Sequence, residues 1–404
     1  MESDGRRRGG GGRKIGGLCA MLCAALCASV PLVQVPWDLL GGDARLSYRT
    51  LGYVGPPKWS EDRLLSGKWA SDLERHLREA GPVVWLLRGL YNEAAFSLGV
   101  FDSPLVHRGR NGWMFYRAGM DPDPGIVFGM RDLRIQAFSR LRALLRSAGA
   151  ELFVVVVPDK DRIYPEMAWR DGRMPELRAG FYDVLMADLE AAGVRHLDAR
   201  SVLMDARRKD PGTLLYYRMD SHWTPEGAMC LARAVARELE TGDLADRLGP
   251  RSEDLALDGP MVVPLLPDTV GLCGFRSVML PVPGMATRFP FPASRLTASL
   301  VEPKRYYRLE LRGDPKDAGQ RLEEARRRSP VALAGTSFSG ENGAASLGAA
   351  LCRVLDDRAI AVGAASRGSM DFLWRLIQRD RGRIRLVIWE VVERGFLDAA
   401  WTGA

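Results

Sequence analysis

The chain has 404 residues, which is enough for one large or two medium domains with a well-buried core. It is 47% hydrophobic and 26% charged, and this globular composition excludes a collagen-like or wholly disordered protein. The net charge of +7 includes five basic residues within positions 1–14, so the excess on the rest of the chain is too small to predict a nucleic-acid-binding protein, although it is compatible with an anionic substrate.

The six cysteines do not form a metal-binding pattern. Cys19, Cys23 and Cys27 lie in an apolar N-terminal run, and the other three are scattered through the chain. Because there is neither a C-x-x-C pair nor a cluster of Cys with His, no zinc site is predicted and no metal is expected.

The N-terminal region has the charge pattern of a membrane anchor. Residues 1–14 are rich in Gly and Arg and are predicted to form a basic cytoplasmic tail. Residues 15–35 carry no charge, and at about 1.5 Å per residue they are long enough to cross a hydrocarbon core of about 30 Å. Basic residues before the span predict that the rest of the chain lies on the extracytoplasmic side of the membrane. A single-pass anchor is favoured, and a cleaved signal peptide is the alternative.

A connector is predicted between this segment and the main domain. Residues 36–100 are expected to be helical, with helices at 59–80 and 83–98. The main domain is predicted to span 101–400. Near its start, the pair Asn111-Gly112 stands between apolar runs, which is typical of a β-hairpin, so a strand is expected to begin at Trp113.

From about residue 130, helical and strand patterns alternate, which predicts an α/β fold with a parallel sheet. The run at 152–157 is apolar throughout, as expected for a strand buried on both faces. Residues 242–328 are rich in Pro and Gly and lack periodicity, so they are predicted to be an insertion that shapes a substrate surface. The remaining elements are expected as helices at 133–148 and 174–192 and as strands at 194–197, 359–362 and 384–389.

A carboxylate and an imidazole stand together in the block Asp220-Ser221-His222-Trp223. Thr224 suits an N-cap and Pro225 the first turn, so the block is predicted to precede a helix. An Asp that accepts from one imidazole nitrogen leaves the other nitrogen free to act as a base. The simpler alternative is a structural hydrogen bond, which is the commoner role of an isolated Asp-x-His in a loop. His196 and His107 are expected to be packing residues.

A hydroxyl group follows the apolar run at 331–335 in the block Gly335-Thr336-Ser337-Phe338-Ser339. A helix is expected after it, at 342–355. A serine on a strand-to-helix turn exposes its oxygen at the carboxyl edge of a sheet, close to backbone N–H groups. Gly-Thr-Ser alone also suits any strand-to-helix junction, so the signal comes from its combination with the Asp-x-His block.

These two blocks resemble those of the alginate O-acetyltransferase AlgX/AlgJ family of SGNH-hydrolase-like proteins, and the similarity covers roughly residues 60–400. Weaker support comes from Gly112-Trp113-Met114-Phe115, from Pro158-Asp159-Lys160 with Tyr164-Pro165, and from Trp389-Glu390 with Arg394. The resemblance implies a flavodoxin-like parallel sheet flanked by helices. The sheet is expected to be circularly permuted, because the serine block comes first in ordinary SGNH hydrolases and last here. The resemblance is closer to AlgJ, since an anchor is predicted and little chain follows Arg394 to form the carbohydrate-binding module of AlgX.

The resemblance also implies residue roles and partners. Ser337 would be the nucleophile, His222 the base and Asp220 the orienting carboxylate. Other candidates for substrate or oxyanion binding are Thr336, Ser339, Arg367, Tyr164 and Trp223. No cofactor is expected. A multispanning membrane O-acyltransferase of the MBOAT, AlgI-like kind would supply acetyl groups, and a polysaccharide would accept them. The alternatives are a carbohydrate acetylesterase and a non-catalytic component of an exopolysaccharide-modification complex.

Overall fold

The computed structural model describes two compact units of the chain, which are treated separately below. The described residues are 60–80, 91, 94, 95, 98, 103–249, 255–263, 268, 276–282, 285–291, 304–311, 324–339, 347–355, 361–364, 378–379 and 382–397. The predicted tail and anchor at 1–14 and 15–35 lie outside this set. Among the residues that are described, no helix is both long enough and apolar enough to cross a membrane.

The first unit comprises residues 1–101 and 274–299. It contains helices α2 (Glu61–Leu65) and α3 (Lys68–Ala80), and an antiparallel hairpin of β6 (Arg276–Val282) and β7 (Met285–Phe291). The prediction of one helix over 59–80 was wrong in detail, because Gly67 takes a positive φ of 71° and separates α2 from α3. Most of the helix predicted at 83–98 lies outside the described residues.

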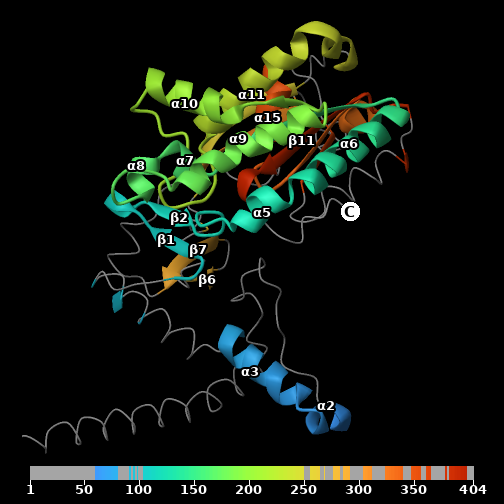
Figure 1. The fold of residues 1–404 in the computed structure, drawn as a ribbon. Helices are drawn as coiled ribbons and strands as arrows, with labels where there is room; N and C mark the ends of the chain where they lie inside the picture. The colour runs from blue at the N-terminus through green and yellow to red at the C-terminus, as the bar shows by residue number, and fades with distance from the viewer. Residues whose placement is uncertain are drawn as a thin grey trace, which may run out of the picture. The chain divides into compact units, whose positions relative to one another are not determined.

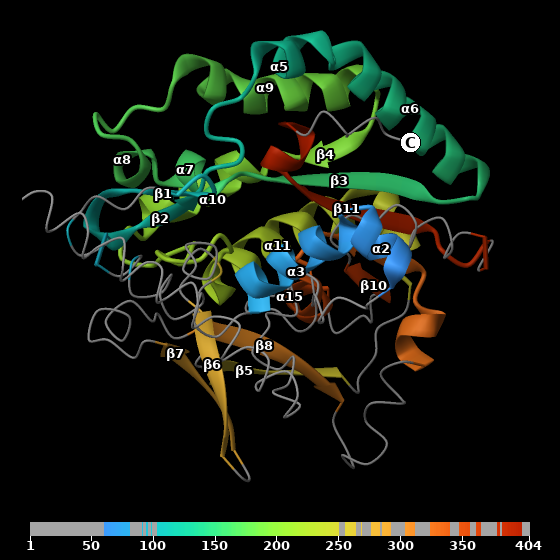
Figure 2. The same cartoon turned by 90° about the horizontal axis from the view of Figure 1, so that it is seen from below.

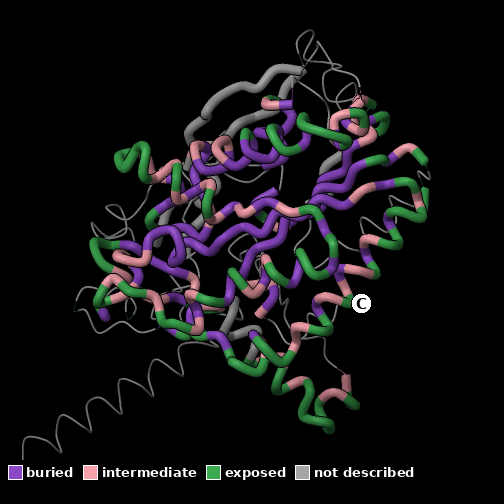
Figure 3. Tube along the Cα trace, turned by 45° about the horizontal axis from the view of Figure 1, so that its top comes forward, coloured by how far each residue is buried: buried purple, intermediate pink, exposed green. Residues whose placement is uncertain are grey.

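The second unit, residues 102–273 and 300–404, is built on a five-stranded sheet in which all paired strands are parallel. Its spatial order is β10-β9-β11-β3-β4. Figure 1 shows β11 of this sheet together with the helices of the unit. The strands are β3 (Glu151–Val157), β4 (Arg195–Leu197), β9 (Val331–Gly335), β10 (Ala361–Ala364) and β11 (Leu386–Val392). Strands β9 and β11 are buried along their whole length, which explains why their sequences show no polar alternation. Figure 3 shows buried segments running through the centre of the described chain.

The strand order confirms the permuted α/β topology. Counted from β9 through β10 and β11 and then on to β3 and β4, the spatial order becomes 2-1-3-4-5, which is the flavodoxin-like order. The chain therefore runs through the sheet in the usual sequence but begins at its fourth strand. The topological switch point, where such sheets bind ligands, lies between β9 and β11 at their carboxyl ends.

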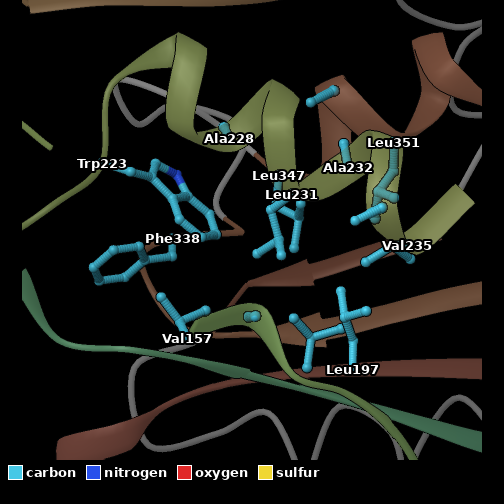
Figure 4. Close-up of a cluster of buried hydrophobic side chains, with 14 of the residues drawn as sticks. Val157, Leu197, Trp223, Ala228, Leu231, Ala232, Val235, Phe338, Leu347 and Leu351 are labelled. Carbon is cyan, nitrogen blue, oxygen red and sulfur yellow. The ribbon is translucent and has the colours of Figure 1, made fainter. Parts of the chain in front are cut away.

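Helices cover both faces of this sheet, as Figure 2 shows. Helices α6 and α9 pack on one face through Phe138, Leu145, Phe181 and Leu185. Helices α11 and α15 pack on the other face (Figure 4). The helices of this unit are α5 (Pro124–Gly129), α6 (Arg131–Ser147), α7 (Lys160–Ile163), α8 (Pro165–Ala168), α9 (Glu176–Ala191), α10 (Ala199–Lys209), α11 (Pro225–Glu240) and α15 (Leu347–Val354).

The hairpin predicted at Asn111-Gly112 is confirmed. Strands β1 (Val106–Arg108) and β2 (Met114–Tyr116) pair antiparallel. Asn111 and Gly112 join them with φ values of 53° and 77°, the left-handed conformation that Asn and Gly adopt most readily.

The segment 242–328 is more regular than the sequence indicated. It begins with a 3-10 helix at Gly242–Arg247, and in the second unit β5 (Leu255–Val263) pairs antiparallel with β8 (Lys304–Leu311). Prolines interrupt the alternating pattern by which strands are recognised: the register of β5 shifts around Gly259-Pro260, and both β6 and β7 contain a proline. Helix α10 was also missed, and β11 extends beyond the predicted end at 389.

A buried ion pair fixes α6 against α9. Asp188 accepts hydrogen bonds of 2.8 Å from the Nε atoms of Arg131 and Arg134, and Arg134 also donates to the carbonyl groups of Ile126 and Val127. Asp188 and Arg134 are almost fully buried. Removing the carboxylate would therefore leave a buried guanidinium without its counter-ion.

We expect Asp188→Ala to lower the free energy of unfolding by about 3–5 kcal/mol, the cost of an uncompensated buried charge. Asp183 is the control, because it lies on the same helix, pairs with Arg200 and is 64% exposed. Asp183→Ala should cost less than about 1 kcal/mol. Urea unfolding of both variants measures the difference, and similar losses would contradict the prediction.

Candidate active site

Three side chains from two distant parts of the sequence, residues 220–222 and residue 337, meet at the carboxyl edge of the sheet. The Nδ1 atom of His222 lies 2.6 Å from Asp220 Oδ1, and its Nε2 atom lies 2.8 Å from Ser337 Oγ. Asp220 is fully buried, His222 is partly exposed and Ser337 is exposed. The structure thus brings together the three residues predicted as a triad, in the order that a carboxylate, a base and a nucleophile require.

The loop that carries Asp220 and His222 is shaped by its own hydrogen bonds. Asp220 Oδ1 also accepts from the backbone N–H of His222 at 3.0 Å, so the carboxylate and the imidazole are joined twice. Thr224 caps α11 as predicted: its hydroxyl accepts from Gly227 N at 3.2 Å and donates to Leu214 O at 2.6 Å. These hydrogen bonds therefore fix the direction in which the triad loop leads into α11.

The Lys160 side chain is hydrogen-bonded to the backbone of the same loop. Its Nζ donates to the backbone carbonyls of Tyr217, Arg218 and Asp220, at 3.1, 2.9 and 2.9 Å. The ammonium group is buried and lies 4.8 Å from the centre of the Phe115 ring, where a cation is attracted to the π face. The block Pro158-Asp159-Lys160 had supported the family resemblance, but nothing in the sequence indicated what the lysine would bind.

The turn that carries Ser337 is held by Glu390, in the middle of the adjacent strand β11. Glu390 accepts from Thr336 N at 2.7 Å, from Thr336 Oγ1 at 2.9 Å and from Ser339 Oγ at 2.9 Å. Thr336 and Ser339, predicted as substrate or oxyanion contacts, thus direct their hydroxyls to this buried carboxylate and fix the turn. A Cβ at Gly335 would lie 2.3 Å from Ser339 Oγ and 2.6 Å from Glu390 Oε2, so only glycine fits there.

Two other candidates lie in the packing beside the triad. The Tyr164 hydroxyl accepts from Leu215 N at 2.9 Å, and the Tyr164 ring is buried 4.5 Å from that of Trp113. Trp223 is fully buried, and its ring meets that of Phe338 edge-on at 4.9 Å (Figure 4). Both buried side chains support the loops of the site, and substrate binding by these two residues stays a prediction. Arg367 lies outside the described residues.

A buried cluster of charges ties the carboxyl ends of β3 and β11 together. Arg178 lies 3.0 Å from both Asp159 and Asp161 and also pairs with Glu393. Burial alone would raise the pKa of Glu393, but Arg178 and Arg162 outweigh it and hold that pKa below the ordinary value. In this cluster the positive charges of Arg162 and Arg178 therefore offset the buried carboxylates with which they pair.

A second carboxylate, Asp268, lies close to Asp220 and His222. Within the described ranges, these three residues form the one group of His, Cys, Asp or Glu side chains with metal-ligand spacing, their donor atoms lying within 4.8 Å of one another. Both oxygens of Asp220 and the Nδ1 atom of His222 already take part in hydrogen bonds. The donor set therefore fits an acid–base triad. That no metal is needed stays a prediction.

The fold and the triad define the class of this protein. A flavodoxin-like sheet that carries an exposed serine after one strand, paired with an Asp-His loop, is the arrangement of an SGNH-hydrolase-like α/β protein. The comparisons with known proteins agree with this class. The family model described as "SGNH hydrolase-like domain, acetyltransferase AlgX" matches residues 106–255.

Individual relatives carry the same family names. The probable alginate O-acetylase AlgJ of Pseudomonas aeruginosa is 30% identical over 184 residues, 45% of each chain, and that of Azotobacter vinelandii is 26% identical over 339 residues, 82% of this chain and 80% of the relative. The chain spans about half the length of the Pseudomonas relatives that it matches.

Two solved structures share the fold. The O-acetyltransferase domain of Pseudomonas putida AlgJ aligns with a TM-score of 0.54 at 23% identity and covers 74% of this chain and 95% of its own. Pseudomonas aeruginosa AlgX aligns with a TM-score of 0.50 at 18% identity, over 73% of this chain and 66% of its own. The family model and the sequence relatives confirm the resemblance to the AlgX/AlgJ family, and these relatives are named AlgJ.

Gly335→Ala is expected to lower the free energy of unfolding by about 1–3 kcal/mol, because the added methyl group would displace Ser339 or Glu390. Gly180→Ala is the matched control, since a Cβ there meets nothing within 4 Å on the exposed side of α9. That variant should gain about 0.5–1 kcal/mol from helix propensity. Equal effects of the two substitutions in urea unfolding would argue against a close-packed serine turn.

The ionisation of Glu390 should appear in the pH dependence of stability. Burial raises the pKa of Glu390 above 4.5, and the hydrogen bonds from Thr336 and Ser339 offset this only in part. A carboxyl group with a raised folded-state pKa contributes stability at low pH and loses it as pH rises through that pKa. The free energy of unfolding of the wild type minus that of Glu390→Gln should thus increase as pH falls from about 7 to about 5. A constant difference over this range would contradict the assignment.

Proposed function

We propose that the protein is an O-acetyltransferase that moves acetyl groups onto a polysaccharide through an acetyl-Ser337 intermediate. The observation that carries this proposal is the 2.8 Å contact between His222 Nε2 and the exposed Ser337 Oγ, with Asp220 on the opposite nitrogen. The names of the relatives, alginate O-acetylase and O-acetyltransferase domain, supply the acyl group and the kind of acceptor.

In the first step, Ser337 Oγ attacks the carbonyl carbon of the acetyl donor while His222 Nε2 takes the hydroxyl proton. The bond from the carbonyl carbon to the leaving group breaks, and His222 gives its proton to that group. Asp220, on Nδ1, fixes the imidazole tautomer and stabilises the positive charge that forms between these transfers. The product is acetyl-Ser337.

In the second step, His222 accepts the proton of a sugar hydroxyl, and the sugar oxygen attacks the acetyl carbon. The bond to Ser337 Oγ then breaks, and His222 returns a proton to the serine. The sugar ester is released, and the enzyme recovers its starting protonation state. If water replaces the sugar in this step, the same residues perform an esterase reaction, so exclusion of water and retention of the sugar decide between the two.

Each tetrahedral intermediate carries a negative oxygen that needs hydrogen-bond donors. The backbone N–H of Ser337 is the candidate donor, since no acceptor in the described part of the chain is bonded to it. A donor aimed at the oxyanion contributes roughly 2.7–4 kcal/mol to transition-state stabilisation. Glu390, by fixing Thr336 and Ser339 on both sides of Ser337, would hold this N–H in place.

The proposed setting follows from the sequence. If residues 15–35 span the inner membrane, the catalytic domain faces the periplasm, where cytoplasmic acetyl-CoA does not reach it. A multispanning MBOAT, AlgI-like O-acyltransferase would therefore pass acetyl groups across, and the protein itself would need no cofactor. Alginate, the polymer in the names of the relatives, is the first acceptor to test, and other exopolysaccharides follow.

Offered an activated acetyl ester, the wild type is expected to gain one acetyl group transiently, seen by intact mass, and to pass it to an added oligosaccharide. Ser337→Ala should gain none. His222→Ala should acetylate more slowly by a factor of about 10³ or more, because the serine loses its base. Ser147→Ala, which changes an exposed serine at the end of α6, should behave as the wild type.

The outcomes separate the candidate functions. Loss of the acetyl group to water at a rate independent of sugar would make the protein an esterase. Identical masses for the wild type and Ser337→Ala throughout would remove the catalytic assignment and leave a non-catalytic component of a modification complex.

A further inference from the structure

Asp268 brings a second carboxylate to the triad from the segment between β5 and β6. Its Oδ1 accepts from Ser221 N at 2.7 Å, and its Oδ2 accepts from the Ser221 hydroxyl. Its backbone N–H donates to Asp220 Oδ2 at 2.8 Å. Asp268 is thus bonded to two successive residues of the loop that presents His222.

The same carboxylate also faces the imidazole. Asp268 Oδ2 lies 3.4 Å from His222 Nδ1, the nitrogen that Asp220 Oδ1 contacts at 2.6 Å. Two carboxylates therefore converge on one side of the base, while Nε2 on the other side contacts Ser337. The Asp268 side chain is 30% exposed and that of Asp220 is 1% exposed, so the second carboxylate is the more solvated of the pair.

Strand β8, which also belongs to segment 242–328, makes a second contact with the triad loop. The Tyr217 hydroxyl donates to Arg305 O at 2.9 Å and accepts from Arg305 N at 2.8 Å. The Arg305 guanidinium lies 2.7 Å from Glu226, in the first turn of α11. The segment is thus bonded on both sides of the Asp-His pair, at Tyr217 before it and at Glu226 after it.

We propose that Asp268 is a positioning residue of the triad whose negative charge stabilises protonated His222 alongside Asp220. This inference rests on the proposed acyl transfer, in which His222 becomes positively charged in both steps. A charge 3.4 Å away in a partly solvated position acts weakly on the neutral imidazole and strongly on the imidazolium. Asp268 is accordingly part of the catalytic apparatus, although the described strands of segment 242–328 pair outside the main sheet.

Substitutions at Asp268 can separate charge from loop support. Asp268→Asn keeps the backbone donor to Asp220 and an oxygen that can accept from Ser221 N, but it removes the charge. Asp243→Asn is the matched control: it makes the same chemical change in the same segment, at an exposed residue paired with Arg195. Thermal unfolding of each full-length variant checks that the fold is retained.

The test measures turnover of p-nitrophenyl acetate and the rate at which phenylmethanesulfonyl fluoride modifies Ser337. For Asp268→Asn we expect kcat and the modification rate to fall by about tenfold to a hundredfold, with KM unchanged within about twofold, because the base is less effective while the substrate still binds. Asp243→Asn should keep both rates.

Other results would overturn the inference in distinguishable ways. Wild-type rates in Asp268→Asn, with a normally reactive wild-type Ser337, would remove the role of Asp268 and leave the acyl-transfer proposal standing. A rise in KM alone would make Asp268 a substrate contact and equally exclude the positioning role. A wild-type Ser337 that reacts no faster than an ordinary serine would remove both proposals.

Discussion

The pairing of β3 with β11 is the constraint on which the active-site geometry depends. Glu390 lies on β11 and holds the serine turn, whereas Lys160 follows β3 directly and holds the Asp-His loop. The two strands are hydrogen-bonded over seven residue pairs, including Glu390 with Val155. Because this register is fixed, the two anchors are held at a set separation, and so are Ser337 and His222, which they support.

The anchors are buried ionic groups, whose removal from water is costly. Lys160 offsets this cost by using all three of its N–H bonds on backbone carbonyls, and Glu390 accepts three hydrogen bonds from the serine turn. Apolar residues of similar volume would pack at lower cost, but they could not fix the direction of a polar loop. In this site, therefore, buried charge specifies geometry more than it adds stability.

Local signals in the sequence predicted much of the fold and the three members of the triad. The apolar run at 152–157 predicted a strand, and Thr224-Pro225 predicted the start of a helix, because each of these signals depends on neighbouring residues alone. The partners of Lys160 and Glu390 lie more than fifty residues away, so no pattern could indicate them. The sequence also gave no direction for the hydroxyls of Thr336 and Ser339, which turn toward Glu390. In 242–328, prolines within the strands removed the periodicity that identifies them.

Asp268 was not predicted as a site residue, because its partners Ser221 and Asp220 also lie far away in the sequence. The permuted topology explains its position. In ordinary SGNH hydrolases the serine strand begins the domain and the Asp-His loop ends it. In this chain the Asp-His loop and α11 come first, so the segment from about 242 to 328 must lead back to the serine strand β9. That connection starts at the helix that follows the triad loop and ends at the strand that precedes Ser337. One described residue of this connection, Asp268, is bonded to the loop that the connection follows. The rearrangement of the chain and the second carboxylate at His222 are in this sense one structural feature.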